Sequence, residues 1–438
     1  DRADGNSYSG VKERWAKSPS VGFRYNFNKE KFLEDKKWLD FGDIRFSYGI
    51  NLRPTTDIYA SLGWYDVAGN YNGVTRISPH LGLMPNPYLK PEKVEQFNYG
   101  LDMSIFNGRI GLTLDAYTKT VYNMLYTRPL STSTGFSSTY TNDASLYNYG
   151  YEVSVTFRPF KTTSKVNWTI NLNTAINRDV LLSLPGGATQ MLSDDETVMN
   201  RVGYGALSNY LYVTQGVYRT DDDVPVDPIT GYRYRSGDVG YYRAGDVKFQ
   251  DIDGNYVTDA SDKQVSGTPV ARITGGFSSY LVYKNFSLNF NGTILFKRDL
   301  INNALSERMD NLRSPYDDGT LVNLSDLNYW SQPGNVAKYP NPYDYRSQAD
   351  SYRALQTLFQ EDGSYIKINA ITLGFTANRT WSSKYHMNAL RVYTTVTNPF
   401  LFTGYSGPNP EAVTELGRDR LDTYPISRTL SFGLNVEF

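Results

Sequence analysis

The sequence predicts an all-β protein, a transmembrane antiparallel β-barrel, and three observations carry this prediction. Apolar and polar residues alternate strictly in many short segments. The chain of 438 residues is 15% aromatic, yet its mean hydropathy is −0.49, so its apolar surface is spread thinly. No run approaches the roughly 18 apolar residues of a spanning helix, whereas barrel strands hide their apolar half in alternation. Finally, the connections between the segments alternate between short and long.

The last eleven residues, RTLSFGLNVEF, are the clearest of these segments. In a strand, Leu430, Phe432, Leu434 and Val436 lie on one face, while Ser431, Gly433, Asn435 and Glu437 lie on the other. The same period of two predicts ten further spanning strands. These are 20–27, 42–52, 95–106, 109–125, 151–157, 166–173, 270–283, 286–291, 371–378 and 389–397.

The connections indicate which kind of β protein this is. Asn107-Gly108 predicts a two-residue hairpin, and Lys284-Asn285 and 159–164 are also tight. Long connections are expected at 53–93, 127–147, 177–269, 298–362 and 400–426. Short turns at one end and long loops at the other are typical of outer-membrane barrels, in which the long loops are extracellular. A soluble β-sandwich fits loops of this length poorly, and no fixed repeat indicates a solenoid.

Strand parity indicates how much of a barrel is present. The first strand, within 18–27, and the last, 427–438, run in the same direction, but a closed antiparallel barrel requires an even number of strands. Eleven strands therefore predict the C-terminal part of a larger barrel that begins in an extracellular loop, unless a second chain completes the wall. The segment 205–220 is the alternative, since it contains a candidate for one additional strand.

Charge and motif content exclude several functions. Forty-four basic and 45 acidic residues give a net charge of −1, so no nucleic-acid surface is predicted. The chain has no cysteine, and its two histidines, His80 and His386, lie far apart and are interpreted as structural or exposed. No nucleophile elbow, histidine-based triad, Walker loop or zinc motif occurs, so an enzyme is not predicted.

One segment has the spacing of a calcium loop. In DIDGNYVTDASD, side-chain oxygens stand at positions 1, 3, 5, 9 and 12, and the Val257 carbonyl stands at position 7. The predicted ligands are Asp251, Asp253, Asn255, Asp259 and Asp262. Position 6 is Tyr256 rather than glycine, and position 12 is the shorter Asp rather than Glu. A solvated acidic turn is the alternative interpretation, and exposed loop charge is also the interpretation of 194–196 and 221–223.

Two groups of loop aromatics are candidate substrate contacts, because rings with polar neighbours stack on sugars or hold peptides. The first group is Trp64, Tyr65 and Tyr71, and the second is Tyr316, Tyr329 and Trp330. The alternative is that these rings fix the loops or belong to an interfacial belt of the membrane.

Several long motifs, in order along the chain, carry a resemblance to a known family. They are DRADGNSYSG with SPSVGFRYNF in 1–27, NPYLKPEKVEQFNYGLDMSIFNGRIGLTLDAY at 86–117, GDVKFQDIDG at 245–254, EDGSYIKINAITLGF at 361–375 and LRVYTTVTNPFLFTGYSGPNPE at 390–411. With these motifs the chain resembles the C-terminal half of the SusC/RagA-like TonB-dependent outer-membrane receptors. It departs from the family in DASLYNYGYEV, before the strand near 150, where a basic stretch is usual. The family's plug domain and TonB-binding segment have no counterpart in these 438 residues.

The resemblance implies a 22-stranded barrel, of which eleven strands are half, integral to the outer membrane of a Gram-negative bacterium. It implies TonB-dependent import of bulky nutrients such as oligosaccharides or oligopeptides, with a SusD-like lipoprotein as partner and no cofactor beyond the candidate Ca²⁺. Phe438 would then be the signal read by the barrel-assembly machinery. A structural or docking subunit without transport is the alternative function, and a passive diffusion channel is a third.

Overall fold

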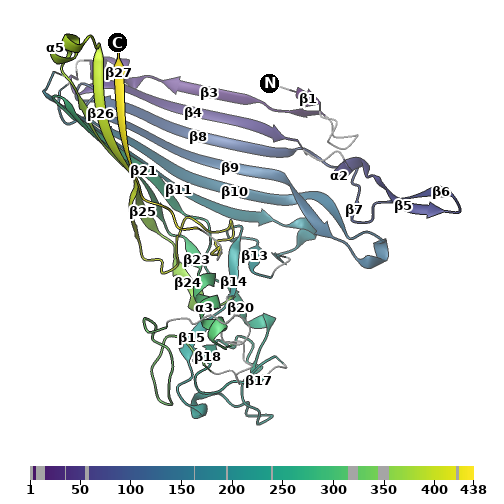
Figure 1. The fold of residues 1–438 in the computed structure, drawn as a ribbon. Coiled ribbons are helices and arrows are strands. Elements are labelled where there is room, and N and C mark those ends of the chain that lie inside the picture. The colour runs from purple at the N-terminus through teal and green to yellow at the C-terminus, as the bar shows by residue number, and fades with distance from the viewer. Residues whose placement is uncertain are drawn as a thin grey trace.

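The computed structural model describes ten stretches of the chain, which form a curved antiparallel wall and a separate unit built from long loops (Figure 1). The described residues are 3–5, 15–34, 36–54, 59–161, 163–193, 196–237, 240–313, 324–343, 355–420 and 424–438. In this part of the chain, no helix has the length and apolar character needed to cross a membrane.

The wall is one sheet in which eleven antiparallel strands follow one another in chain order, and a twelfth, short strand, β7 (Leu83–Met84), pairs in parallel with β10 beside them. The strands are β3 (Ser20–Tyr25), β4 (Leu39–Arg53), β8 (Glu92–Ile105), β9 (Ile110–Pro129), β10 (Ser138–Phe157), β11 (Val166–Ser183), β21 (Ile273–Tyr283), β22 (Phe286–Phe296), β25 (Tyr365–Thr376), β26 (Ala389–Thr403) and β27 (Thr429–Glu437). The predicted number of spanning strands is confirmed. Within the described residues β3 and β27 are the two edges and do not pair, so the wall is open.

Each strand of the wall presents an apolar face on the convex side and a polar face on the concave side. Phe432 is paired with Thr394, and 78% of its surface is exposed on the convex face. Glu152 is paired with Asp115 on the concave face. The alternation read from the sequence therefore separates two environments.

Two predictions about connections are wrong, and the alternative of an additional wall strand is excluded. The predicted loop 127–147 is mostly strand, because β9 and β10 continue as a long hairpin and leave only 130–137 between them. The predicted two-residue turn at Asn107-Gly108 is wider, because pairing stops at Ile105–Ile110. The segment 205–220 contains no spanning strand. Its short strands β14 (Ser208–Tyr212) and β15 (Thr214–Val217) pair within the loop unit.

Short elements surround the wall. They are β1 (Ala3–Gly5), β2 (Trp15–Lys17), α1 (Lys31–Glu34), α2 (Tyr59–Leu62), β5 (Tyr65–Tyr71), β6 (Val74–Pro79), β7 (Leu83–Met84) and α5 (Arg379–Ser382). The hairpin β5–β6 projects beyond the long-loop end of β4 and β8 (Figure 1). At the opposite, short-turn end, α5 lies between β25 and β26.

The loop unit is built from the connections 184–272, 297–364 and 404–428. Its elements are β12 (Gln190–Leu192), β13 (Val198–Arg201), β14, β15, β16 (Arg235–Ser236), β17 (Gly240–Tyr241), β18 (Val247–Phe249), β19 (Val257–Thr258), β20 (Lys263–Val265), β23 (Asp299–Ile301), α3 (Asn303–Arg313) and β24 (Gln360–Asp362). Two buried clusters hold it together. One is rich in tyrosine, around Tyr218, Tyr234 and Tyr242, and the other surrounds Ile301 and Phe359.

Candidate functional site in the concave face and the loop unit

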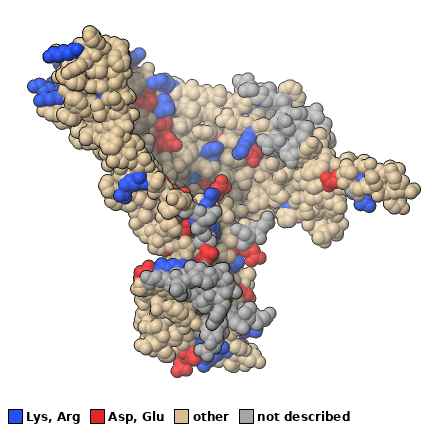
Figure 2. Space-filling view, viewed as in Figure 1, with Lys and Arg blue, Asp and Glu red and all other residues tan. Residues whose placement is uncertain are grey.

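Charged side chains gather in the hollow of the wall (Figure 2). The Arg45 Nε donates to Asp102 Oδ2 at 2.7 Å, and the Arg45 Nη2 donates to Asp115 Oδ1 at 3.2 Å. Arg24 pairs with the fully buried Asp43 on the neighbouring strands. These groups lie on four consecutive strands, β3, β4, β8 and β9, so ion pairs reinforce the ladder on the concave face.

Glycines leave room for side chains that cross a strand. Gly100 lies on β8, between Arg45 and Asp115, and a Cβ there would stand 2.7 Å from the guanidinium carbon. Gly150 has the same role on β10, where the Tyr117 hydroxyl donates to Asn177 Oδ1 at 2.6 Å. Because each bridge joins strands that are not direct neighbours, it fixes the polar face beyond what backbone pairing does.

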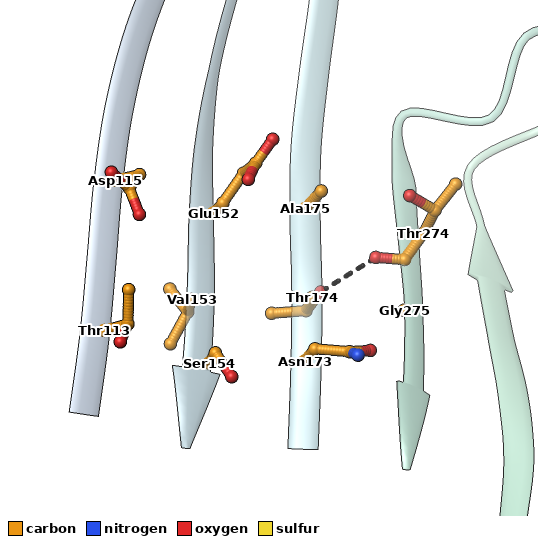
Figure 3. A pocket seen from close by; sticks show the side chains of 10 residues that line it. All are labelled: Thr113, Asp115, Glu152, Val153, Ser154, Asn173, Thr174, Ala175, Thr274 and Gly275. Carbon is orange, nitrogen blue, oxygen red and sulfur yellow. Dashed lines mark hydrogen bonds between the residues drawn. The ribbon is translucent and has the colours of Figure 1, made fainter. Parts of the chain in front are cut away.

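A cavity on the concave face lies beside this network (Figure 3). It has a volume of about 530 Å³ and is lined by β9, β10, β11 and β21. Asp115 and Glu152 contribute carboxylates, and Ser154, Asn173 and Thr274 contribute neutral polar groups. The Thr174 hydroxyl donates to the Thr274 carbonyl at 3.3 Å. The cavity is open and carries two carboxylates, so it suits a hydrated or basic ligand.

Polar contacts clamp the three long loops to one another at the end of the wall. Arg418 donates to Asn209 Oδ1 at 2.9 Å and to the Thr197 carbonyl at 3.2 Å. The Asn302 Nδ2 donates to Ser406 Oγ at 3.0 Å. The Arg298 guanidinium donates to the carbonyls of Pro269 and Pro410. Burial lowers the pKa of Arg298. Together, the contacts of Arg418, Asn302 and Arg298 join the three loops into one body.

The three residues of the first predicted aromatic group lie in two different environments. Trp64 stacks on His80 with ring centroids 4.0 Å apart, and the His80 Nδ1 lies 2.7 Å from Asp66 Oδ2. Trp64 thus holds the base of the β5–β6 hairpin. Tyr65 and Tyr71 are 68% and 77% exposed on that hairpin, so their rings are free to contact a ligand or a partner.

Two members of the second predicted aromatic group, Tyr329 and Trp330, lie in the loop unit. Trp330 is only 7% exposed, and its indole N–H donates to the Arg219 carbonyl at 3.1 Å. Tyr329 packs on Tyr343 and on the second buried cluster. Tyr316 lies outside the described residues. The two groups are therefore not parts of one site, and their role in substrate binding stays a prediction.

The predicted calcium loop is closely assembled. One carboxylate oxygen from each of Asp251, Asp253 and Asp262 lies within 4.8 Å of the others. Asp251 accepts the N–H groups of Gly254 and Tyr256, as the first residue of such a loop does in forming its turn. Position 6 of a calcium loop usually holds glycine because the backbone there has a positive φ. Tyr256 adopts this conformation, with φ +60°, although it is not glycine.

The remaining predicted ligands are partly engaged with the chain itself. The Asn255 amide donates to Asp253 Oδ2 at 3.0 Å, and the Asp259 Oδ1 accepts from the Ser261 N–H. Asp262 is fully buried, and this burial raises its pKa, with the Asp251 and Asp253 carboxylates adding to the effect. Three clustered carboxylates, one of them buried, fit a hard cation. Ca²⁺ binding remains a prediction.

The cross-strand bridges are the part of the site that sequence reasoning missed. Arg45, Asp102 and Asp115 all lie on faces predicted to be polar, but their contact depends on the register of three strands and on a sequence separation of 70 residues. The local signal was Gly100, because a glycine within a strand often marks a place where another group approaches the backbone closely. The loop clamps around Arg418 had no signal, because their partners lie in irregular segments.

Comparison with known proteins places this geometry in a family. Residues 1–304 match the model of the TonB-dependent receptor-like β-barrel. A TonB-dependent receptor of Formosa agariphila is 28% identical over 473 residues, covering 100% of this chain and 44% of the relative. The TonB-dependent receptor SusC of Bacteroides thetaiotaomicron is 27% identical over 457 residues, covering 100% of this chain and 41% of the relative.

A solved structure of the RagAB peptide transporter has the same fold, with a TM-score of 0.79 at 23% identity, covering 99% of this chain and 44% of that one. The chain thus spans less than half the length of the relatives it matches. The all-β wall, the family model that matches residues 1–304 and the alignment of the whole of this chain with part of SusC lead to one conclusion: the chain belongs to the TonB-dependent receptor β-barrel family.

Proposed function

We propose that this chain supplies eleven strands of a 22-stranded barrel in a SusC-like, TonB-dependent importer of bulky nutrients such as oligosaccharides or oligopeptides. In this proposal the barrel lies in the outer membrane of a Gram-negative bacterium, with the loop unit outside the cell and the short turns in the periplasm. The observation that carries it is the concave face of the wall, which has cross-strand ion pairs and an open cavity of about 530 Å³ lined by two carboxylates, in a chain that matches the family's barrel model.

The partners follow from the same family. A surface lipoprotein of the SusD type would cover the loop unit, and the TonB complex would act through the part of the receptor that this chain does not contain. The name RagAB peptide transporter, carried by a protein of the same fold, supports the oligopeptide class. The name SusC supports the importer class in general. Phe438, 83% exposed at the end of β27, fits an insertion signal for the barrel-assembly machinery.

The rival function is a structural or docking subunit without transport, and the exposed loop unit and hairpin favour it. Two adjacent residues of β10 separate the two functions when changed in the complete receptor. Ser154 lines the concave cavity, and Val155 belongs to the convex face. We expect Ser154→Trp to reduce uptake of the nutrient several-fold and Val155→Trp to leave it unchanged. Uptake should also require TonB.

Equal uptake by both variants, together with growth that does not depend on TonB, would favour the structural subunit. Tyr65→Ala and Tyr71→Ala test the exposed aromatics separately, through the affinity for the imported ligand. Tyr122→Ala, on the wall and 38% exposed, is the control ring. An affinity that none of these variants changes would remove the hairpin rings from the site.

A further inference from the structure

The short turns at one end of the wall are strongly basic. The four turns 106–109, 158–165, 284–285 and 377–388 contain seven Lys or Arg residues and no Asp or Glu. The fifth connection at this end, 26–38, adds four Lys and three acidic residues, so basic residues at this rim outnumber acidic ones by eleven to three. At the other end, the loop segment 184–272 contains 13 acidic and 8 basic residues. Figure 2 shows basic side chains gathered at the end of the wall near α5. The two rims of one wall therefore differ in the sign of their charge.

The basic side chains of this rim are available to a partner. Six of the seven are exposed, namely Arg158, Lys161, Lys165, Lys284, Arg379 and Lys384. Among the described residues none of them forms an ion pair. The Arg158 guanidinium donates only to the Gly108 carbonyl, at 3.0 Å. Cations that outnumber the acidic residues of the same rim are expected to recruit anions from its surroundings.

Aromatic rings accompany these cations on the convex face. Phe286 and Phe375 are cross-strand partners with ring centroids 5.1 Å apart, and Tyr283 is paired with Phe286 on the neighbouring strand. The Lys284 ammonium lies 5.3 Å from the centre of the Tyr283 ring. Trp381 in α5 and Tyr385 in the turn after it form a second pair, with centroids 5.0 Å apart. Rings together with long basic side chains are typical of the headgroup level of a membrane.

We propose that this basic rim, with its aromatic collar, binds the phosphate headgroups of anionic phospholipids in the adjacent leaflet. The proposal rests on the orientation given under Proposed function, which places the short turns at the periplasmic leaflet. The rings lie at the acyl boundary, and the ammonium and guanidinium groups extend toward the headgroups. A lipid is favoured over a soluble anion because the cations form a row beside apolar rings rather than surrounding a closed cavity.

Native mass spectrometry of the complete receptor, released from nanodiscs, tests this inference. The nanodiscs contain equal amounts of phosphatidylcholine and phosphatidylglycerol. The variant carries Lys161→Gln, Lys165→Gln and Lys284→Gln. The matched control removes three exposed cations from the long-loop end, through Arg76→Gln, Arg233→Gln and Lys338→Gln. Each cation near a charged headgroup surface contributes about fivefold to binding. We therefore expect the rim variant to retain at least about fivefold less phosphatidylglycerol than the parent or the control.

Equal retention by the rim variant and the parent would overturn the inference. Equal loss from the control would also overturn it, because binding would then follow total charge. Excess free phosphate should not displace the lipid, and displacement would assign the rim to soluble anions instead. The orientation is tested separately with Lys161→Cys, since the chain has no native cysteine. Labelling of this residue by an impermeant maleimide in intact cells would contradict the proposed orientation without affecting the lipid measurement.

Discussion

The wall and the loop unit of this chain are stabilised in different ways. In the wall, large apolar side chains such as Phe432 face outward, and regular pairing and polar bridges hold the strands together. In the loop unit, the backbone is irregular and the order comes from buried rings such as Tyr242, which is 0% exposed. One chain therefore combines a wall whose fold is determined by the pairing register of its strands with a loop unit whose fold is determined by a packed core.

The largest expected effect is on the core of the loop unit. Tyr242→Ala removes a buried ring that contacts Tyr218 and Tyr234 and a hydroxyl that donates to Thr258. We expect the local unfolding free energy of the loop unit to fall by about 3 to 5 kcal/mol, while the wall stays folded. Hydrogen exchange, measured separately for 208–266 and for the wall strands, checks this difference.

The control for this prediction is Tyr232→Ala, because Tyr232 lies in the same unit and is 62% exposed. It should change the local free energy by less than about 0.5 kcal/mol. If Tyr242→Ala also increased exchange in β9 and β10, the loop unit and the wall would unfold as one cooperative unit, and the distinction between them would fail.

A smaller effect is expected in the wall itself. Arg45→Met leaves the carboxylates of Asp102 and Asp115 without their cation in the half-buried concave face. We expect the barrel to lose about 2 kcal/mol, because charge-assisted bonds are lost and the anions then repel one another. Urea unfolding of the complete receptor in lipid measures this loss. Arg53→Met is the control, since Arg53 is 79% exposed and 3.9 Å from Glu92, and it should cost under about 0.5 kcal/mol.

Ca²⁺ at the predicted loop would stabilise only the loop unit and leave the stability of the wall unchanged. At ten times the dissociation constant, Ca²⁺ adds about 1.4 kcal/mol to the stability of the unit. Isothermal titration with Ca²⁺ and hydrogen exchange of 245–266 measure binding and stabilisation. Asp253→Asn should weaken both Ca²⁺ binding and the stabilisation by Ca²⁺. If the parent protein shows no heat of binding and no added protection from exchange, the loop is a solvated acidic turn rather than a calcium site.

The sequence predicted the wall better than the loop unit, because regular strands leave a periodic pattern in the sequence and an irregular packed core does not. Strands were predicted because period two is visible in eleven segments, and their number was correct. The extension of β9 and β10 beyond the predicted ends was not visible, because pairing rather than alternation determines it. The carboxylates of the calcium loop were predicted to converge because they lie within twelve residues. The contact between Arg45 and Asp115 needs the register of the whole sheet, and the tyrosine core of the loop unit follows no period at all.

The smallest effect concerns pH and again separates the two regions. Asp419 is 5% exposed in the loop unit, and in the described part of the chain its Oδ2 accepts no hydrogen bond. Burial raises the pKa of Asp419 above its ordinary value. A raised pKa in the folded state means that ionisation costs stability. This contribution is therefore fully present below the ordinary carboxyl pKa and is lost as pH rises through the raised value.

We expect Asp419→Asn to raise the stability of the loop unit near neutral pH by about 1 kcal/mol and to flatten its pH dependence, because a neutral amide replaces a buried carboxylate. Thermal unfolding of the loop unit, followed by hydrogen exchange between pH 4 and pH 8, measures both changes. The pH dependence of the stability of the wall strands should be the same in parent and variant. A variant less stable than the parent at neutral pH would mean that the charged carboxylate is itself stabilising, as in an ion pair with one of the arginines that clamp the loops.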